Sequence, residues 1–198
     1  MLHPSRRLPA LSAFVPALRA ALLAALLGLG AQAAGAAEAW ERFFTRSLGD
    51  YRAELADARA ASKKGVMFVY QQDPCPYCER MKANILSRPD VQKWYGARFA
   101  AYSIDVRGSV EIQDFAGRST TESRYAREAL VRGAPAVDFY DLEGRLLARV
   151  PGEIDDPRTF LALGEWVASG AHEKQSFDEF RAARKLGGAP LKINVYKP

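Results

Sequence analysis

The chain has few of the residues that build metal sites and disulfide-stapled folds: its 198 residues include two cysteines and two histidines. Two thiols are too few for a closed four-thiolate zinc site, and the histidines, His3 and His172, lie far from the cysteines in sequence. We therefore expect no metal. Hydrophobic residues make up 48% of the chain, enough for a core without disulfide staples. The cysteine pair is therefore free to be catalytic.

A basic segment that could bind nucleic acid is also lacking, although the formal net charge is +5. The first 37 residues hold three arginines and no acid, and the remainder carries 25 basic and 23 acidic residues, a net of +2. No run of five or more basic residues occurs in that remainder. The composition gives no support to a nucleic-acid partner.

The apolar run near the N-terminus, residues 20–29, is shorter than the roughly 20 residues of a membrane-spanning helix. It comes after a positively charged leader and is followed by two small-x-small triplets, Ala31-Gln32-Ala33 and Ala34-Gly35-Ala36. This arrangement predicts a cleaved secretory signal peptide over residues 1–37 rather than an uncleaved anchor. We expect a periplasmic protein.

Both cysteines lie in one short stretch, Asp-Pro-Cys-Pro-Tyr-Cys, that follows the apolar segment Val66–Tyr70. That segment is typical of a buried strand, and residues 76–87 are typical of a helix. Cys75 would lie at the helix N-terminus, where unpaired backbone N–H groups favour the thiolate and lower the thiol pKa below about 8.5. Pro76 suits the first helical position. Cys78 comes one turn later, close enough to form a disulfide with Cys75, which predicts a dithiol that exchanges disulfides.

The remaining pattern predicts an α/β domain. Residues 38–62 suggest a helix broken at Gly49 with Asp50 as a cap, and 106–121 suggest a small inserted arm. Crossover connections imply parallel strands, and a final hairpin adds an antiparallel strand. The further predicted strands are Phe99–Asp105, Ala136–Tyr140 and Arg145–Val150; the further predicted helices are Asp90–Tyr95, Glu122–Arg132, Asp156–Ser169 and Ser176–Leu186.

Two motifs give this chain a family resemblance. The Cys-x-x-Cys after a strand, together with Val131-Arg132-Gly133-Ala134-Pro135-Ala136, resembles the thioredoxin superfamily. The resemblance implies that Pro135 is a cis-proline facing Cys75 and that Gly152 flanks the site. It implies a thioredoxin fold: a central mixed sheet flanked by helices, with a small inserted arm and a C-terminal helical extension. The domains would be 38–170, with the insertion at about 106–121, and 171–198 for the C-terminal helix and tail.

Within the superfamily, the chain resembles periplasmic thioredoxin-like proteins of the SoxW type. That likeness implies an enzyme that reduces protein disulfides, with a redox-active Cys75–Cys78 disulfide and no other cofactor. Cys75 would be the nucleophile and Cys78 the resolving thiol. A membrane electron donor of the DsbD or CcdA kind is the implied upstream partner, and we expect a monomer. The residues expected to bind substrate are Pro76, Tyr77, Ala134, Pro135 and Gly152.

Two positions depart from the family pattern. Ala134 replaces the threonine or β-branched residue that many members carry before the cis-proline. Val69 stands where classical thioredoxins have a buried aspartate. The nearest carboxylates in sequence are Asp73 and Glu79, so either could take part in proton transfer at Cys78, with water as the simpler alternative.

Two alternative functions stay open. A dithiol oxidase or isomerase of the DsbA kind would run the same exchange in another direction, since the direction depends on the reduction potential. A large inserted helical domain is usual in those oxidases, and about 15 residues at 106–121 favour a reductase. The other alternative is a non-catalytic thioredoxin-fold binding module.

Overall fold

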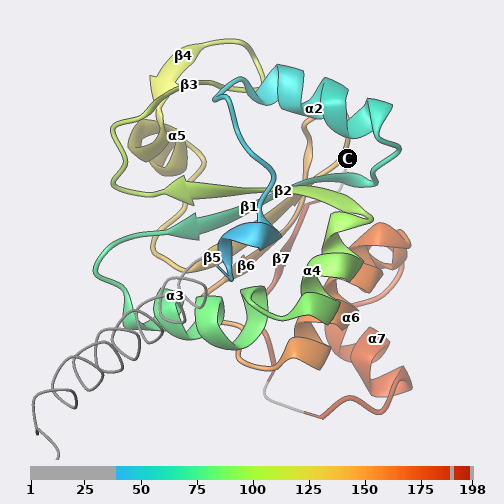
Figure 1. Ribbon diagram of the computed structural model, residues 1–198. Helices are drawn as coiled ribbons and strands as arrows, with labels where there is room; N and C mark the ends of the chain where they lie inside the picture. Colours follow the sequence, from blue (N-terminus) through green and yellow to red (C-terminus); the bar gives the residue numbers. More distant parts are fainter. Residues whose placement is uncertain (1–38, 188–189, 197–198) are drawn as a thin grey trace, which may run out of the picture. The chain divides into compact units, whose positions relative to one another are not determined.

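The computed structural model describes residues 39–187 and 190–196 (Figure 1). The predicted signal peptide lies outside the described residues. Among the described residues, none of the helices has both the length and the apolar character to cross a membrane.

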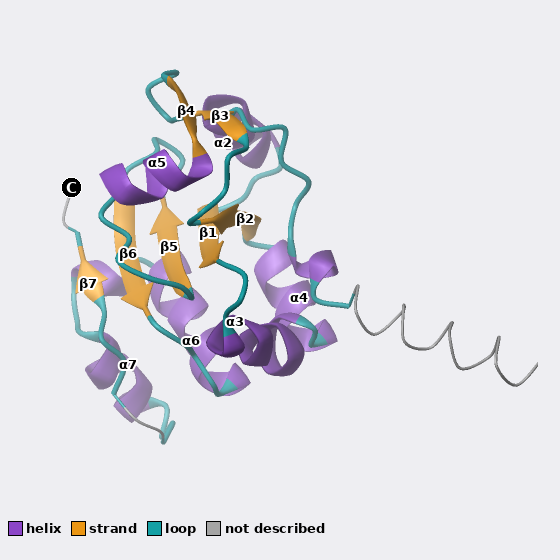
Figure 2. Ribbon diagram, turned by 90° about the vertical axis from the view of Figure 1, so that its left-hand side faces the viewer, coloured by secondary structure: helices purple, strands orange, loops and turns teal. Residues whose placement is uncertain are grey.

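A five-stranded mixed sheet forms the centre of the domain, in the order β2-β1-β5-β6-β7 (Figure 2). Strands β1 and β2 are parallel, and the other neighbouring pairs are antiparallel. The strands are β1 (Gly65–Gln71), β2 (Phe99–Asp105), β5 (Ala136–Tyr140), β6 (Leu146–Pro151) and β7 (Asn194–Val195). The mixed sheet that the resemblance implied is confirmed.

Helices cover both faces of this sheet (Figure 2). Side chains alternate along β1, so that Met67 and Val69 pack on one face while Phe68 and Tyr70 pack on the other. The first face is covered by α3 (Pro76–Met81), the π-helical turn η3 (Lys82–Leu86), α4 (Pro89–Gly96), α6 (Pro157–Ala168) and α7 (Phe177–Ala183). The second is covered by α2 (Tyr51–Ala60), α5 (Glu122–Glu128) and the hairpin of β3 (Glu111–Gln113) and β4 (Ser119–Thr121). The hairpin is the predicted arm.

The predicted direction of Ala136–Tyr140 is wrong. This strand, β5, pairs antiparallel with β1. Its first residue, Ala136, lies opposite Tyr70, and the last residue of β2, Asp105, lies opposite Gln71. The connection between β2 and β5 therefore begins and ends at the same end of the sheet, so its hairpin and short helix do not return the chain to the opposite end.

The segment before α2 also differs from its prediction. In the described part of this segment, residues 39–49, the only helix is the short 3-10 helix η2 (Glu41–Phe43). Phe43 nevertheless reaches the core. The predicted cap is confirmed, because the Asp50 side chain accepts hydrogen bonds from the first-turn N–H groups of α2. Gly49, with a φ of +80°, directly precedes this cap.

The C-terminal extension contributes both to the core and to the sheet edge. Ser176 begins α7 with a capping box, as the Ser-x-x-Glu spacing predicts. His172 is buried, at 7% exposure; its surroundings include Trp166, whose ring lies edge-on to it. The tail after α7 adds β7 to the free edge of β6.

Candidate active site

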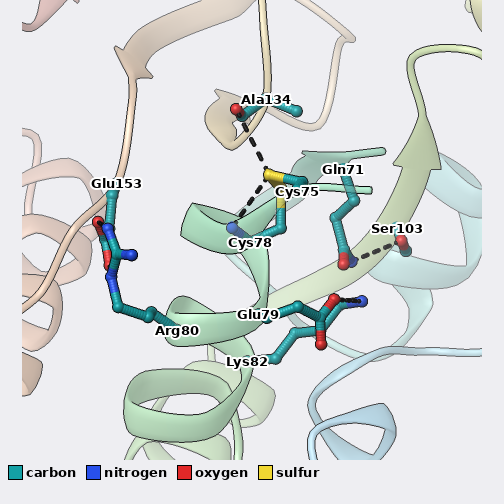
Figure 3. The surroundings of a disulfide bond; sticks show 9 residues. All are labelled: Gln71, Cys75, Cys78, Glu79, Arg80, Lys82, Ser103, Ala134 and Glu153. Atoms are coloured by element: carbon teal, nitrogen blue, oxygen red, sulfur yellow. Dashed lines mark hydrogen bonds and ion pairs between the residues drawn. A yellow bond between two sulfur atoms is a disulfide. The ribbon is translucent and has the colours of Figure 1, made fainter. Parts of the chain in front are cut away.

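Cys75 occupies the N-cap of α3, at the end of the loop that leaves β1. Its Sγ accepts a hydrogen bond from the Cys78 backbone N–H at 3.1 Å, and the two sulfurs are joined in a disulfide (Figure 3). Pro76 takes the first helical position, where the missing N–H costs no hydrogen bond. In the reduced protein, the helix N-terminus and this N–H would stabilise negative charge on Cys75.

The loop before β5 forms the opposite wall of the site. The Ala134–Pro135 peptide bond is cis, as the resemblance implied; the Asp73–Pro74 bond is cis as well. The Ala134 carbonyl oxygen lies 3.7 Å from Cys75 Sγ, so this loop and the cysteine are in contact. Gly152 has a φ of +93°, and its N–H donates to the Pro135 carbonyl. The structure therefore brings together Cys75, Ala134, Pro135 and Gly152.

The side chains between and beside the cysteines lie at the surface. Tyr77 is 56% exposed, which leaves its ring available to a partner. Glu79 is also exposed and forms an ion pair with Lys82 at 2.8 Å. Asp73 is exposed as well. The roles of Tyr77 in substrate binding and of Asp73 and Glu79 in proton transfer stay predictions.

The position that differs from classical thioredoxins is buried and apolar, because Val69 packs in the core beneath α3. Two residues further along β1, the buried side chain of Gln71 donates to the Ser103 hydroxyl at 2.8 Å (Figure 3). Sequence reasoning gave Gln71 no role. Its position on the same strand face as Val69 was a signal that could have drawn attention to it.

An ion pair joins α3 to the loop that carries Gly152. Arg80 donates to Glu153 through Nε at 3.0 Å and through Nη2 at 2.7 Å (Figure 3). The Arg80 guanidinium also lies over the Tyr77 ring, 4.5 Å from its centroid. The hydrogen bonds to Glu153 raise the pKa of Arg80. This connection was missed from the sequence, although Glu153 directly follows the glycine assigned to the site.

Comparisons with known proteins found one matching family and several similar solved structures. The thioredoxin-like domain family matches residues 51–168. A thioredoxin-fold protein from Helicobacter pylori has 22% identity and a TM-score of 0.52, over 62% of this chain and 80% of that one. A thioredoxin from Thermus thermophilus has 27% identity and a TM-score of 0.43, over 64% of this chain and 88% of that one. The reduced C-terminal domain of DsbD from Neisseria meningitidis has 22% identity and a TM-score of 0.43, over 59% and 90%.

No curated protein matches the chain. The family match covers more than half of the chain and includes both cysteines and the cis-proline loop, and the Helicobacter structure shows the same fold. The chain therefore belongs to the thioredoxin-like domain family, and its Cys75–Cys78 pair makes it a thiol–disulfide oxidoreductase.

Proposed function

We propose that this protein is exported to the periplasm and reduces disulfide bonds in other proteins. The observation that carries the proposal is the position of Cys75, whose sulfur lies at a helix N-terminus and against the Ala134 carbonyl. Cys78 lies one turn further along α3 and is 2% exposed, which suits the resolving thiol.

The reaction follows from these positions. The Cys75 thiolate attacks one sulfur of the substrate disulfide, which forms a mixed disulfide and releases the other substrate sulfur as a thiolate. Cys78, as its thiolate, then attacks Cys75 Sγ. This step forms the Cys75–Cys78 disulfide and releases the second substrate thiolate, so the substrate gains two electrons and the protein loses two. A dithiol donor must then reduce the pair.

A periplasmic location would require such a donor to bring electrons across the membrane. We propose a membrane reductase of the DsbD or CcdA kind for this step, on the basis of the signal-like N-terminus. We also propose that, within the superfamily, this protein is a periplasmic thioredoxin-like protein of the SoxW type.

Insulin reduction with dithiothreitol as electron donor tests the activity. The wild-type protein should accelerate insulin precipitation, Cys75→Ser should abolish the acceleration, and Cys78→Ser should accumulate a mixed disulfide. Turnover retained by Cys75→Ser would overturn the assignment. The reduction potential tests direction: a value near about −270 mV supports a reductase, and one near about −120 mV would make the protein an oxidase.

A further inference from the structure

A groove continues from the active site toward the C-terminal tail. Its volume is about 510 Å³, and three segments line it: residues 130–136, the end of β6, and the tail at Asn194 and Tyr196. The lining includes the Ala134–Pro135 loop, and the Ala134 carbonyl contacts Cys75. A substrate chain held at Cys75 can therefore extend into this space.

The C-terminal tail is fixed in place as one wall. Asn194 pairs with Arg149 across the β6–β7 ladder, and the Tyr196 N–H donates to the Leu147 carbonyl at 2.9 Å. Tyr196 remains 38% exposed. The tail, for which the sequence suggested no function, thus extends the surface that begins at the cis-proline.

The groove carries an uncompensated positive charge. No acidic residue lies among its lining residues, which include Arg132 and Arg149. Both Asp138 carboxylate oxygens accept from Arg149, and Arg149 Nη1 donates to the Ala129 carbonyl; the charge of this buried arginine is therefore compensated by Asp138. Arg132 is exposed and has no hydrogen-bond or ion-pair partner within residues 39–187 and 190–196.

The rim of the groove presents a large apolar side chain. Leu130 is 70% exposed and directly follows Ala129, the C-cap of α5. Its φ of +59° is a left-handed conformation that glycine usually takes at this position. This conformation lets the Val131 N–H donate to the Ala126 carbonyl and so completes the helix end. The leucine side chain is left at the rim, and an apolar rim beside a cation suits a peptide better than a small ion.

We propose that Arg132 selects, among the protein segments that bind at the cis-proline loop beside the attacked cysteine, those with aspartate or glutamate near that cysteine. Arg132 lies two residues from Ala134, at most about 7 Å of chain. The acid would therefore lie about two or three residues from the cysteine. This inference rests on the proposed reductase function and adds the class of substrate.

Two disulfide-linked peptides test this proposal. One has glutamate and the other has glutamine at the second and third positions on either side of the cysteine, and they are otherwise identical. The reduced protein should reduce the glutamate peptide about two- to fivefold faster at low salt, and high salt should remove the difference. Arg132→Gln should abolish the preference, and Arg132→Glu should reverse it.

Arg127→Gln, an equal charge change on the exposed face of α5, should leave the preference intact. Tyr196→Ala should slow both peptides, because it removes part of the tail wall.

The outcomes separate the two proposals. Equal rates for both peptides, or a preference that Arg132→Gln leaves unchanged, would overturn the groove assignment alone. Failure of the wild-type protein to reduce either peptide or insulin would overturn the reductase function, and the groove assignment with it.

Discussion

Arg80 and Glu153 are 73 residues apart in sequence, and their side chains form two parallel hydrogen bonds beside the active site. Paired hydrogen bonds between guanidinium and carboxylate fix orientation as well as distance. Arg80 is on α3, the helix whose N-cap is Cys75, and Glu153 directly follows Gly152. The pair therefore joins the two sides between which a substrate must bind.

Glu153→Gln should weaken substrate binding more than chemistry. The glutamine side chain is uncharged and has a single acceptor oxygen, so it cannot accept both hydrogen bonds from Arg80 as the carboxylate does. The Gly152 loop therefore loses its fixed position relative to α3. We expect the KM for a protein disulfide to rise about two- to fivefold with kcat nearly unchanged, as measured by steady-state insulin reduction. Glu143→Gln, which removes the exposed Arg59–Glu143 pair in the β5–β6 turn, is the matched control and should leave KM unchanged. A fall in kcat alone would contradict a positioning role.

Asp138→Ala should strongly destabilise the fold. Asp138 is fully buried, and its carboxylate accepts from Arg149, Tyr70 and Tyr140. Burial opposes the charged form of Arg149, but the ion pair with Asp138 outweighs it and raises the Arg149 pKa. Removing the carboxylate leaves a buried guanidinium unpaired, which costs about 3–5 kcal/mol. Urea unfolding at pH 7 measures this loss.

The double variant Asp138→Leu with Arg149→Met provides the comparison for that prediction. Replacing both charges by apolar groups removes the unpaired cation, so most of the lost stability should return. Asp90→Ala, which breaks an exposed pair with Arg88, should change the unfolding midpoint little. A single Asp138→Ala variant as stable as wild type would show that the ion pair is not needed for the fold.

Local signals predicted how two helices begin. Cys75 is the N-cap of α3 with Pro76 in its first position, and Asp50 is the N-cap of α2; each of these features depends only on residues within one turn. The cis-proline came from a short motif that a resemblance recognised. Such features need no knowledge of which distant segments meet.

Several features that sequence reasoning missed depend on pairing between distant segments. The antiparallel direction of β5 depends on the end of the sheet at which the connection from β2 finishes. Strand β7 is two residues long, which is too short to show an alternating pattern of apolar and polar residues. The contacts of Arg149 with Asp138 and of Arg80 with Glu153 join side chains whose partners no spacing rule specifies. The first of these contacts holds Arg149 in the wall of the groove, and the second joins α3 to the loop that carries Gly152.

Gly164→Ala should destabilise the packing of α6 on α4. A Cβ at Gly164 would lie 2.5 Å from a Trp94 ring atom and 2.8 Å from the Tyr95 hydroxyl. Tyr95 is fully buried and donates to the Phe160 carbonyl, so it has little room to move. We expect the free energy of unfolding, measured with urea, to fall by about 1–3 kcal/mol.

Gly96→Ala, where a Cβ would meet nothing within 4 Å, is the control and should be neutral or stabilising by up to about 1 kcal/mol. Equal effects at the two glycines would contradict the packing argument.

Glu54→Gln should change how stability depends on pH. Glu54 is 5% exposed, and its Oε2 has no hydrogen-bond partner within the described part of the chain. Burial raises the pKa of this carboxyl, against the lowering effect of the Ser47 hydroxyl. Because the folded pKa lies above the unfolded value of about 4.3, the stability from this group is complete at low pH and is lost as pH rises through the folded pKa. Glutamine cannot ionise, so the stability of the variant relative to wild type should rise as pH increases above the unfolded pKa of about 4.3. Urea unfolding of the disulfide form at a series of pH values measures that difference. Glu111→Gln, at an exposed site on β3, should give a constant difference, and a constant difference for Glu54→Gln would show that its carboxyl does not ionise with a raised pKa.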